Sequence, residues 1–350
     1  MLPNNKNNTA KTYKLALDAM GGDNSPYSVV AGANLFAEKN SNIFFIFFGD
    51  KEKLEPILNK HSKLKKCSEV VHTTEFISAD EKPSTALRKS KNSSMRLAIE
   101  AVKNGKADAI VSAGNTGALM VMSKLILKTL DGIDRPAICT IIPTKKGSSL
   151  LLDMGANSAC DAENLAQFAI MGDAFAKAAL TVESPSIGLL NIGSEELKGH
   201  ETVRVANQIL GEEYTHLNYH GYVEGDDIMT GVVDVIVTDG FTGNIALKAI
   251  EGTAKILTGF FKEGFKASIF SRIGFLFSAL SLKHVFKRID PRNHNGAMFV
   301  GLNGISIKSH GNADKLGFAN ALKVAVNLIE NKINDKIIEE LRLTNNNNNQ

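Results

Sequence analysis

Short apolar runs that end in polar, glycine-bearing turns recur along the whole chain. The clearest is IGLLNI at 187–192, which Pro185 precedes and GSEELKG follows. A run of this length is too short for a helix, and turn residues on both sides are typical of a buried strand in a parallel sheet. The pattern therefore predicts a strand that delivers a polar loop containing Lys198.

The same pattern, an apolar run followed by a polar turn, predicts a series of strands and helices. We expect strands at 13–18, 43–48, 109–112, 149–153, 187–192, 232–238 and 304–308, and helices at about 93–103, 162–179 and 314–331, with two more starting near residues 25 and 244. Strands that alternate with helices favour an α/β fold whose largely parallel sheet is covered on both faces.

Six polar turns follow these strands. They are AMGGD, AGNTGA, DMGAN, NIGSEELKG, DGFTGN and SHGNAD. Ligands of such sheets bind outside the carboxyl ends of the strands, so the turns should meet at one edge. Each also precedes an expected helix start, where free backbone N–H groups and the helix dipole favour an anion. Neither a P-loop nor a G-x-G-x-x-G fingerprint is present.

Composition narrows the class of protein. The chain has 350 residues, 43% of them apolar, and a formal charge of +3, which argues against a general nucleic-acid surface. Its three cysteines lack metal-site spacing and favour a reducing compartment. The first residues lack the apolar core of a signal peptide, so we expect a cytoplasmic protein. We interpret 1–12 and 344–350 as disordered tails around a single catalytic unit at 13–343.

Residues 250–289 differ from the rest of the chain. From 254 onward phenylalanines alternate with lysines and arginines, and Glu263 is the only carboxylate. A helical hairpin of this composition can lie at a membrane surface, or can bury its phenylalanines in a dimer. A break near 268–271 would leave apolar side chains at its tip.

Seven blocks in one order carry a resemblance to a known family. They are LALDAMGGD, SAGNTGALM, RPAI, LLDMGAN, NIGSEELKG, DGFTGNIALK and GLNGISIKSHG. Together they resemble the bacterial phosphate acyltransferase family, PlsX. One block departs from the pattern, because His294 stands where an aromatic residue is expected.

The resemblance implies a fold and a reaction. The fold is a three-layer α/β/α unit like those of phosphotransacetylases and isocitrate dehydrogenases, here with a protruding helical hairpin. The reaction transfers a long-chain acyl group from acyl-[acyl carrier protein] to inorganic phosphate, and the acyl phosphate feeds phospholipid synthesis. The resemblance also implies a homodimer with peripheral membrane contact through 254–289, and we expect no cofactor, no metal and no nucleic acid partner.

The reaction needs two placed reactants and stabilised charge rather than a covalent intermediate. We expect Lys198 to neutralise phosphate or the oxyanion and Asn244 to donate a hydrogen bond. His310 either protonates the leaving thiolate, binds phosphate or caps a turn, and Asp239 and Asp18 either orient charged groups or cap helices. Further expected contacts to the substrate or to phosphate come from glycines and asparagines: Gly21, Gly22, Gly114, Asn115, Asn157, Gly193 and Gly243. Cys160 is expected to be structural.

Three other functions compete with this one. A coenzyme A-dependent phosphotransacetylase would share the fold and the chemistry. A metal- and NAD-dependent decarboxylating dehydrogenase would need clustered aspartates and arginines, which the sequence does not show. A non-enzymatic scaffold at a membrane surface would keep the hairpin but would not need six polar turns.

Overall fold

Eleven strands form one sheet in the order β3-β2-β1-β4-β11-β10-β5-β6-β9-β7-β8. The computed structural model describes residues 11–347, apart from the side chains of 280–281, 284–289, 291 and 345–347. The strands are β1 Tyr13–Asp18, β2 Ile43–Gly49, β3 Ser68–His72, β4 Ala109–Ser112, β5 Ala137–Pro143, β6 Ser148–Leu152, β7 Ser186–Leu190, β8 Asn218–Val223, β9 Val235–Val237, β10 Ala297–Val300 and β11 Ile305–Lys308.

The sheet consists of two parallel halves joined by an antiparallel centre. Strands β3, β2, β1, β4 and β11 run parallel to one another, as do β6, β9, β7 and β8. Between them, β10 pairs antiparallel with β11 and β5, and β5 pairs antiparallel with β6. The predicted α/β class with a largely parallel sheet is confirmed. Strands β3, β5, β8 and β10 were not predicted.

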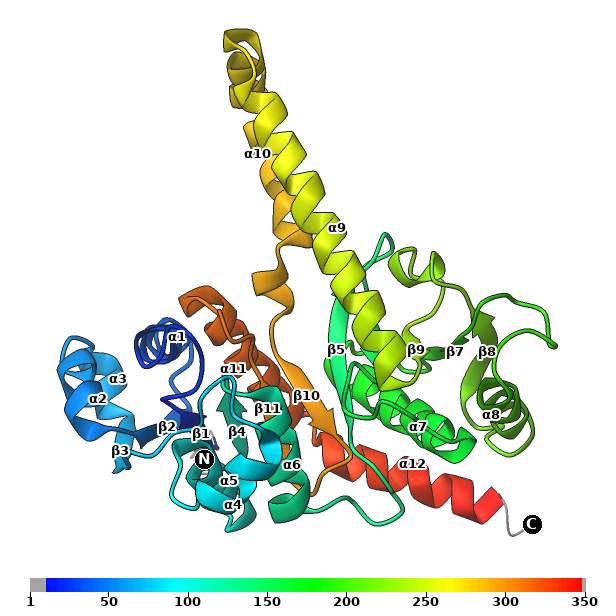
Figure 1. Ribbon diagram of the computed structural model, residues 1–350, viewed down its shortest axis with the longest axis horizontal. Helices are drawn as coiled ribbons and strands as arrows, with labels where there is room; N and C mark the ends of the chain where they lie inside the picture. Colours follow the sequence, from blue (N-terminus) through cyan, green and yellow to red (C-terminus); the bar gives the residue numbers. More distant parts are fainter. Residues whose placement is uncertain (1–10, 348–350) are drawn as a thin grey trace, which may run out of the picture.

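Helices cover both faces of the sheet (Figure 1). They are α1 Tyr27–Ala37, α2 Lys51–Leu58, α3 Ser62–Lys66, α4 Pro83–Lys89, α5 Ser94–Lys103, α6 Thr116–Leu127, α7 Ala162–Ala179, α8 Glu201–Glu212, α9 Gly240–Lys266, α10 Ile269–Ile289, α11 Lys315–Glu330 and α12 Ile333–Asn347, with short 3₁₀ helices at Asp227–Met229 and Pro291–His294. Successive strand residues point to opposite faces, so Leu15 and Leu17 belong to the same core as α1, α7 and α11, while Ala16 belongs to the core that includes α5 and α6. Two cores therefore sandwich the sheet, which gives three layers.

Helices α9 and α10 form a hairpin that stands out from the body as an arm (Figure 1). α10 begins just after Ser268, whose hydroxyl accepts a hydrogen bond from the Ser271 amide at 3.0 Å. The rings of Phe265 and Phe275 lie 4.9 Å apart across the turn. α9 starts at Gly240, ahead of the predicted start near 244, because Asp239 caps it. The arm is therefore a direct extension of a helix that begins in the body.

The C-terminal boundary was predicted too early. α12 continues to Asn347, through residues that we assigned to the tail from 344 onward. Thr344 is buried, and its hydroxyl donates to the Glu340 carbonyl. The asparagine-rich composition hid this last turn of α12 from the sequence pattern. Residues 1–10 and 348–350 of the two predicted tails lie outside the described residues.

Among the described helices, none combines the length and the hydropathy of a membrane-spanning segment.

Candidate active site

Three turns at the carboxyl ends of β1, β4 and β11 bond to one another. The Asp23 amide donates to the Gly311 carbonyl at 2.8 Å, and the Ser309 amide donates to the Ser112 carbonyl at 2.8 Å. The convergence expected for AMGGD, AGNTGA and SHGNAD is therefore present in this half of the sheet.

Asp18 is the buried centre of these turns. Its carboxylate accepts hydrogen bonds from the hydroxyls of Ser94 and Ser112, each at 2.6 Å. Burial raises the pKa of Asp18 despite these bonds. Neither serine was predicted, because Ser94 opens a helix far along the chain and Ser112 ends a strand.

Lys308 joins two of the same turns. Its ammonium donates to the Ala113 carbonyl at 3.0 Å and to the Ser309 carbonyl at 2.6 Å. Burial lowers the pKa of Lys308 to about 8, against the attraction of Asp18 and Asp23. The sequence offered one signal for this residue, a lysine in the last strand position before SHG, which we interpreted only as part of a strand.

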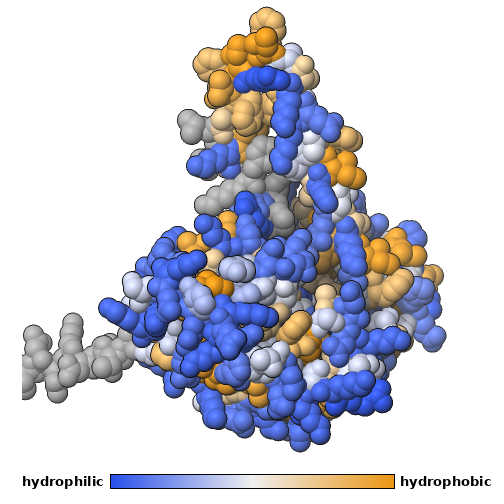
Figure 2. Space-filling model, turned by 60° about the vertical axis from the view of Figure 1, so that its left-hand side comes forward, coloured by the Kyte–Doolittle hydropathy of each residue, from blue (hydrophilic) through white to orange (hydrophobic). Residues whose placement is uncertain are grey.

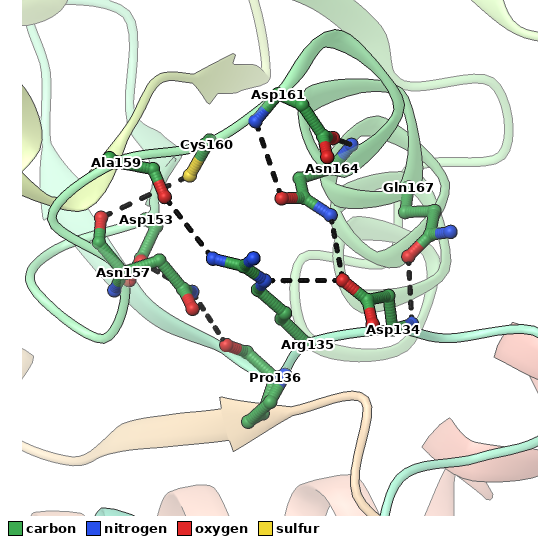
Figure 3. A network of polar contacts seen from close by, with 10 residues as sticks. All are labelled: Asp134, Arg135, Pro136, Asp153, Asn157, Ala159, Cys160, Asp161, Asn164 and Gln167. Carbon is green, nitrogen blue, oxygen red and sulfur yellow. Dashed lines mark hydrogen bonds and ion pairs between the residues drawn. The ribbon is translucent and has the colours of Figure 1, made fainter.

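Asp153 has the corresponding place in the other half of the sheet (Figure 3). Its carboxylate accepts hydrogen bonds from the amides of Ile138, Ala156 and Asn157 at 2.7 to 3.0 Å. The Asn157 side chain donates to Asp153 at 2.9 Å and to the Pro136 carbonyl at 2.8 Å. Asn157 therefore shapes the DMGAN turn, and both of these hydrogen bonds come from its side-chain amide nitrogen. We did not predict that the Asp153 carboxylate would hold this turn together.

Arg135 and Cys160 border this turn (Figure 3). Arg135 donates to the Ala159 carbonyl at 3.3 Å and pairs with Asp134 at 3.1 Å. Burial raises the pKa of the Cys160 thiol to about 12, so the thiol stays protonated and is a poor nucleophile at neutral pH.

The first turn of α9 packs directly against the DMGAN turn. Asp239 accepts hydrogen bonds from the amides of Phe241 and Thr242, each at 2.9 Å, which makes it the cap of the helix. The Asn244 side chain lies beside Gly155. Within residues 11–347 the side-chain amide of Asn244 has no hydrogen-bond partner. Its nitrogen can therefore donate a hydrogen bond to a substrate.

Lys198 lies on the loop after β7, the strand next to β9 in the sheet. Asn191 holds this loop by donating to the carbonyls of Gly193 and Lys198, each at 3.1 Å. The Lys198 ammonium is 2.8 Å from Glu195, and the side chain is 49% exposed. Among the described contacts none joins Lys198 to Asn244, so adjacent strands deliver them to the same edge without bringing them together.

One contact connects the two halves of the candidate site. The His310 imidazole is 3.5 Å from the Glu251 carboxylate, and the pairing lowers the pKa of Glu251. Asn295 fixes His310 by accepting a hydrogen bond from its backbone amide at 2.9 Å. Glu251 stands seven residues after Asn244 on α9, two helical turns along the same face. The turn after β11 therefore faces the helix that carries Asn244.

Comparison with known proteins assigns the family. A family model described as a fatty acid synthesis protein matches residues 13–336. A phosphate acyltransferase from Rhodospirillum centenum is 52% identical over 332 residues, which cover 95% of this chain and 94% of the relative. A phosphate acyltransferase from Paramagnetospirillum magneticum is 50% identical over 326 residues, which cover 93% of this chain and 93% of the relative. The chain belongs to the phosphate acyltransferase family, PlsX.

Solved structures support the fold of this acyltransferase. A phosphotransacetylase from Streptococcus pyogenes has a TM-score of 0.63 at 18% identity, with 92% of this chain and 95% of that chain covered. The EutD phosphotransacetylase from Staphylococcus aureus has a TM-score of 0.58 at 17% identity, with 91% and 94% covered. At this identity the likeness concerns the fold alone, which is the phosphotransacetylase-like fold that the sequence predicts.

The glycines of the acyltransferase let its own turns approach one another. A side chain at Gly21 would meet Asp18 and Gly114, and one at Gly22, whose φ is +103°, would meet Ala113. At Gly193 it would meet the aliphatic part of Lys198, and at Gly243 the Asp153 carbonyl. Protein fills the space that a Cβ would occupy at each of these four positions, so the turns need glycine there to pack against one another.

Asn115 also has an internal role. Its side chain donates to the carbonyls of Ala79 and Glu81 at 2.8 and 2.9 Å and accepts from the Ala118 amide at 2.9 Å, which caps α6. All of these groups are engaged, so Asn115 holds the segment before α4 against the turn after β4.

A groove of about 980 Å³ lies away from the residues described above. α1, α11, the β5–β6 turn and the segment before β10 line it, and His294 is one of its residues. The departure from the family pattern at His294 therefore alters the wall of this groove. Within the described part of the chain, no group of three or more His, Cys, Asp or Glu side chains is arranged to hold a metal ion.

Proposed function

We propose that this acyltransferase moves a long-chain acyl group from acyl-[acyl carrier protein] to inorganic phosphate where the turn after β11 faces the N-terminal half of α9. Family membership supports acyl transfer to phosphate. The observation that carries the location is the contact between His310 and Glu251, which places an exposed imidazole opposite the helix face that bears the free Asn244 amide.

The residues fit a direct displacement. A phosphate oxygen attacks the thioester carbonyl, the tetrahedral oxyanion collapses, and the carbon–sulfur bond breaks to give acyl phosphate and the carrier thiolate. Asn244 donates to the oxyanion, and Lys198 stabilises negative charge from the adjacent loop. His310, when protonated beside Glu251, gives a proton to the leaving thiolate. This assignment needs no nucleophilic side chain, which agrees with the protonated state of Cys160.

The other predicted site residues support these three. Asp239 caps α9 and so places Asn244, and Asp18 holds the turns that carry His310 through Ser112. Asn115, Asn157 and the glycines keep the turns in register, so we propose that they contribute to phosphate binding through the backbone that they position. Preorganised backbone of this kind costs no rearrangement when charge develops.

The reaction is tested with purified protein and palmitoyl-[acyl carrier protein]. We expect carrier thiol release to require inorganic phosphate, with hydroxylamine trapping one acyl hydroxamate for each thiol released. Acetyl-coenzyme A serves as the competing donor, and we expect it to react poorly because the phenylalanine-rich arm favours a long chain. Phosphate-independent thiol release, or faster turnover of acetyl-coenzyme A, would refute the assignment.

We further propose that the enzyme is a cytoplasmic homodimer that touches a membrane with the end of its arm. At the tip Phe270 and Phe277 are each 86% exposed and Leu276 is 73% exposed, and Figure 2 shows this apolar end beside basic side chains. Nearer the body, Ile256, Leu257 and Phe260 are more than half exposed, a face suited to a second copy. Apolar side chains beside cations favour an anionic membrane surface.

Replacing Phe270 and Phe277 with serine should abolish most co-sedimentation with vesicles that contain anionic lipid. The mass in sedimentation velocity should remain that of the wild type, because the proposed dimer face lies nearer the body. Unchanged vesicle binding would contradict membrane contact at the tip, and a fall in mass would show that the tip belongs to the dimer.

A further inference from the structure

Lys248 lies between Asn244 and Glu251 on α9 and is not among the predicted site residues. It stands four residues after Asn244 and three before Glu251, and these spacings place neighbouring side chains on one helix face. Glu251 reaches His310 at 3.5 Å, so this face is turned toward the loop after β11. Lys248 therefore belongs to the same edge of the molecule as the proposed acyl-transfer site.

The charge of Lys248 is not neutralised by a close partner. Within residues 11–347 it forms no hydrogen bond and no ion pair within 4 Å, and it helps His310 to lower the pKa of Glu251. Two other lysines near the turns are engaged, since Lys198 pairs with Glu195 and Lys308 donates to two carbonyls. Lys248, by contrast, can bind an anion through its ammonium without breaking an existing contact.

We propose that Lys248 binds the phosphate nucleophile and holds it between the Asn244 amide and His310. This inference rests on the proposed function and adds the residue that selects its second substrate. An inorganic phosphate dianion needs a cation and several donors within a few ångströms, and Lys248, Asn244 and His310 supply them from two elements. Lys248 makes and breaks no covalent bond; it orients one phosphate oxygen toward the thioester. In this arrangement Lys198 stabilises the negative charge of the oxyanion.

The test separates the two substrates by their KM values. We expect Lys248→Ala to raise KM for inorganic phosphate tenfold or more, with KM for palmitoyl-[acyl carrier protein] within twofold of wild type. Lys248→Arg should restore most of the phosphate affinity, because it keeps a cation on the same face. Lys198→Ala should instead lower kcat more than tenfold with little change in KM for phosphate.

Lys124→Ala is the matched control. Lys124 is the ninth residue of α6, as Lys248 is of α9, it is exposed, and its helix also follows a glycine-bearing turn. We expect this variant to keep wild-type constants. Titration calorimetry with inorganic phosphate alone should show weaker binding to Lys248→Ala than to the wild type.

The outcomes distinguish the inference from the proposed function. If the wild type releases carrier thiol only with phosphate, an unchanged KM for phosphate in Lys248→Ala overturns the role of Lys248 and leaves the function intact. If the wild type shows no phosphate-dependent release, the function itself fails. Equal losses of phosphate and carrier affinity in Lys248→Ala would assign this lysine to general structure and would also overturn the inference.

Discussion

Asn244→Ala should lower kcat by about 100-fold or more while the protein keeps its fold, because one preorganised oxyanion donor is typically worth ~2.7 to 4 kcal/mol. The side-chain amide has no hydrogen-bond partner within residues 11–347, so its removal leaves no buried group unsatisfied. The change should therefore appear in turnover and not in the free energy of unfolding. Steady-state turnover and urea unfolding measured on the same preparation check both halves of this expectation.

Two further variants sharpen the Asn244 prediction. Asn244→Asp keeps the shape but places a carboxylate where negative charge develops, so its turnover should be at least as low. Asn115→Ala removes an asparagine that caps α6, and it should lower stability by about 1 kcal/mol. Turnover of Asn244→Ala within threefold of the wild type would exclude Asn244 as an oxyanion donor.

The sequence predicted the fold where its hydrophobic pattern is periodic. The runs at 13–18 and 109–112 are the observed strands β1 and β4, and 162–179 is the observed helix α7. β10 has four residues and lies between glycines in an irregular stretch, so its own sequence gave no clear period. The antiparallel centre of the sheet depends on this strand, and its pairing is a long-range property.

The candidate site shows a similar division. The polar turns could be found because glycine and asparagine after an apolar run have few other uses. Which side chains remain free could not be read from the sequence, since Asn115 and Asn244 occur in nearly the same motif, GNTGA and GNIAL. The difference arises because the segment that ends near Glu81 supplies carbonyls to Asn115, whereas Asn244 receives none.

Lys177→Met should cost about 3 to 5 kcal/mol of folding free energy, the usual loss when a buried ion pair loses one partner. The Lys177 ammonium lies 2.7 Å from Asp173 and 2.5 Å from Glu340, and both carboxylates are buried. The pair with Asp173 lies within α7, and the pair with Glu340 joins α7 to α12, so the variant leaves two carboxylates facing each other across the helix contact. Urea unfolding at pH 8 measures the loss.

The deficit of Lys177→Met should shrink as the pH falls. Burial raises the pKa of Asp173 to about 6, and the attraction of Lys177 opposes that rise, so the pKa climbs further in the variant. A carboxyl whose pKa is higher in the folded than in the unfolded state takes up a proton on folding, which favours the folded state below its folded pKa. His216 lies 3.8 Å from Glu340, and burial together with the Lys177 charge lowers its pKa, so removal of Lys177 lets this imidazole take up a proton more readily as the pH falls. Unfolding at pH 5 should therefore show a smaller difference from the wild type than at pH 8, and Glu340→Gln in the Lys177→Met background should recover part of the loss. A loss below about 1 kcal/mol at pH 8, or a deficit that grows toward pH 5, would show that these charges do not hold α12 in place.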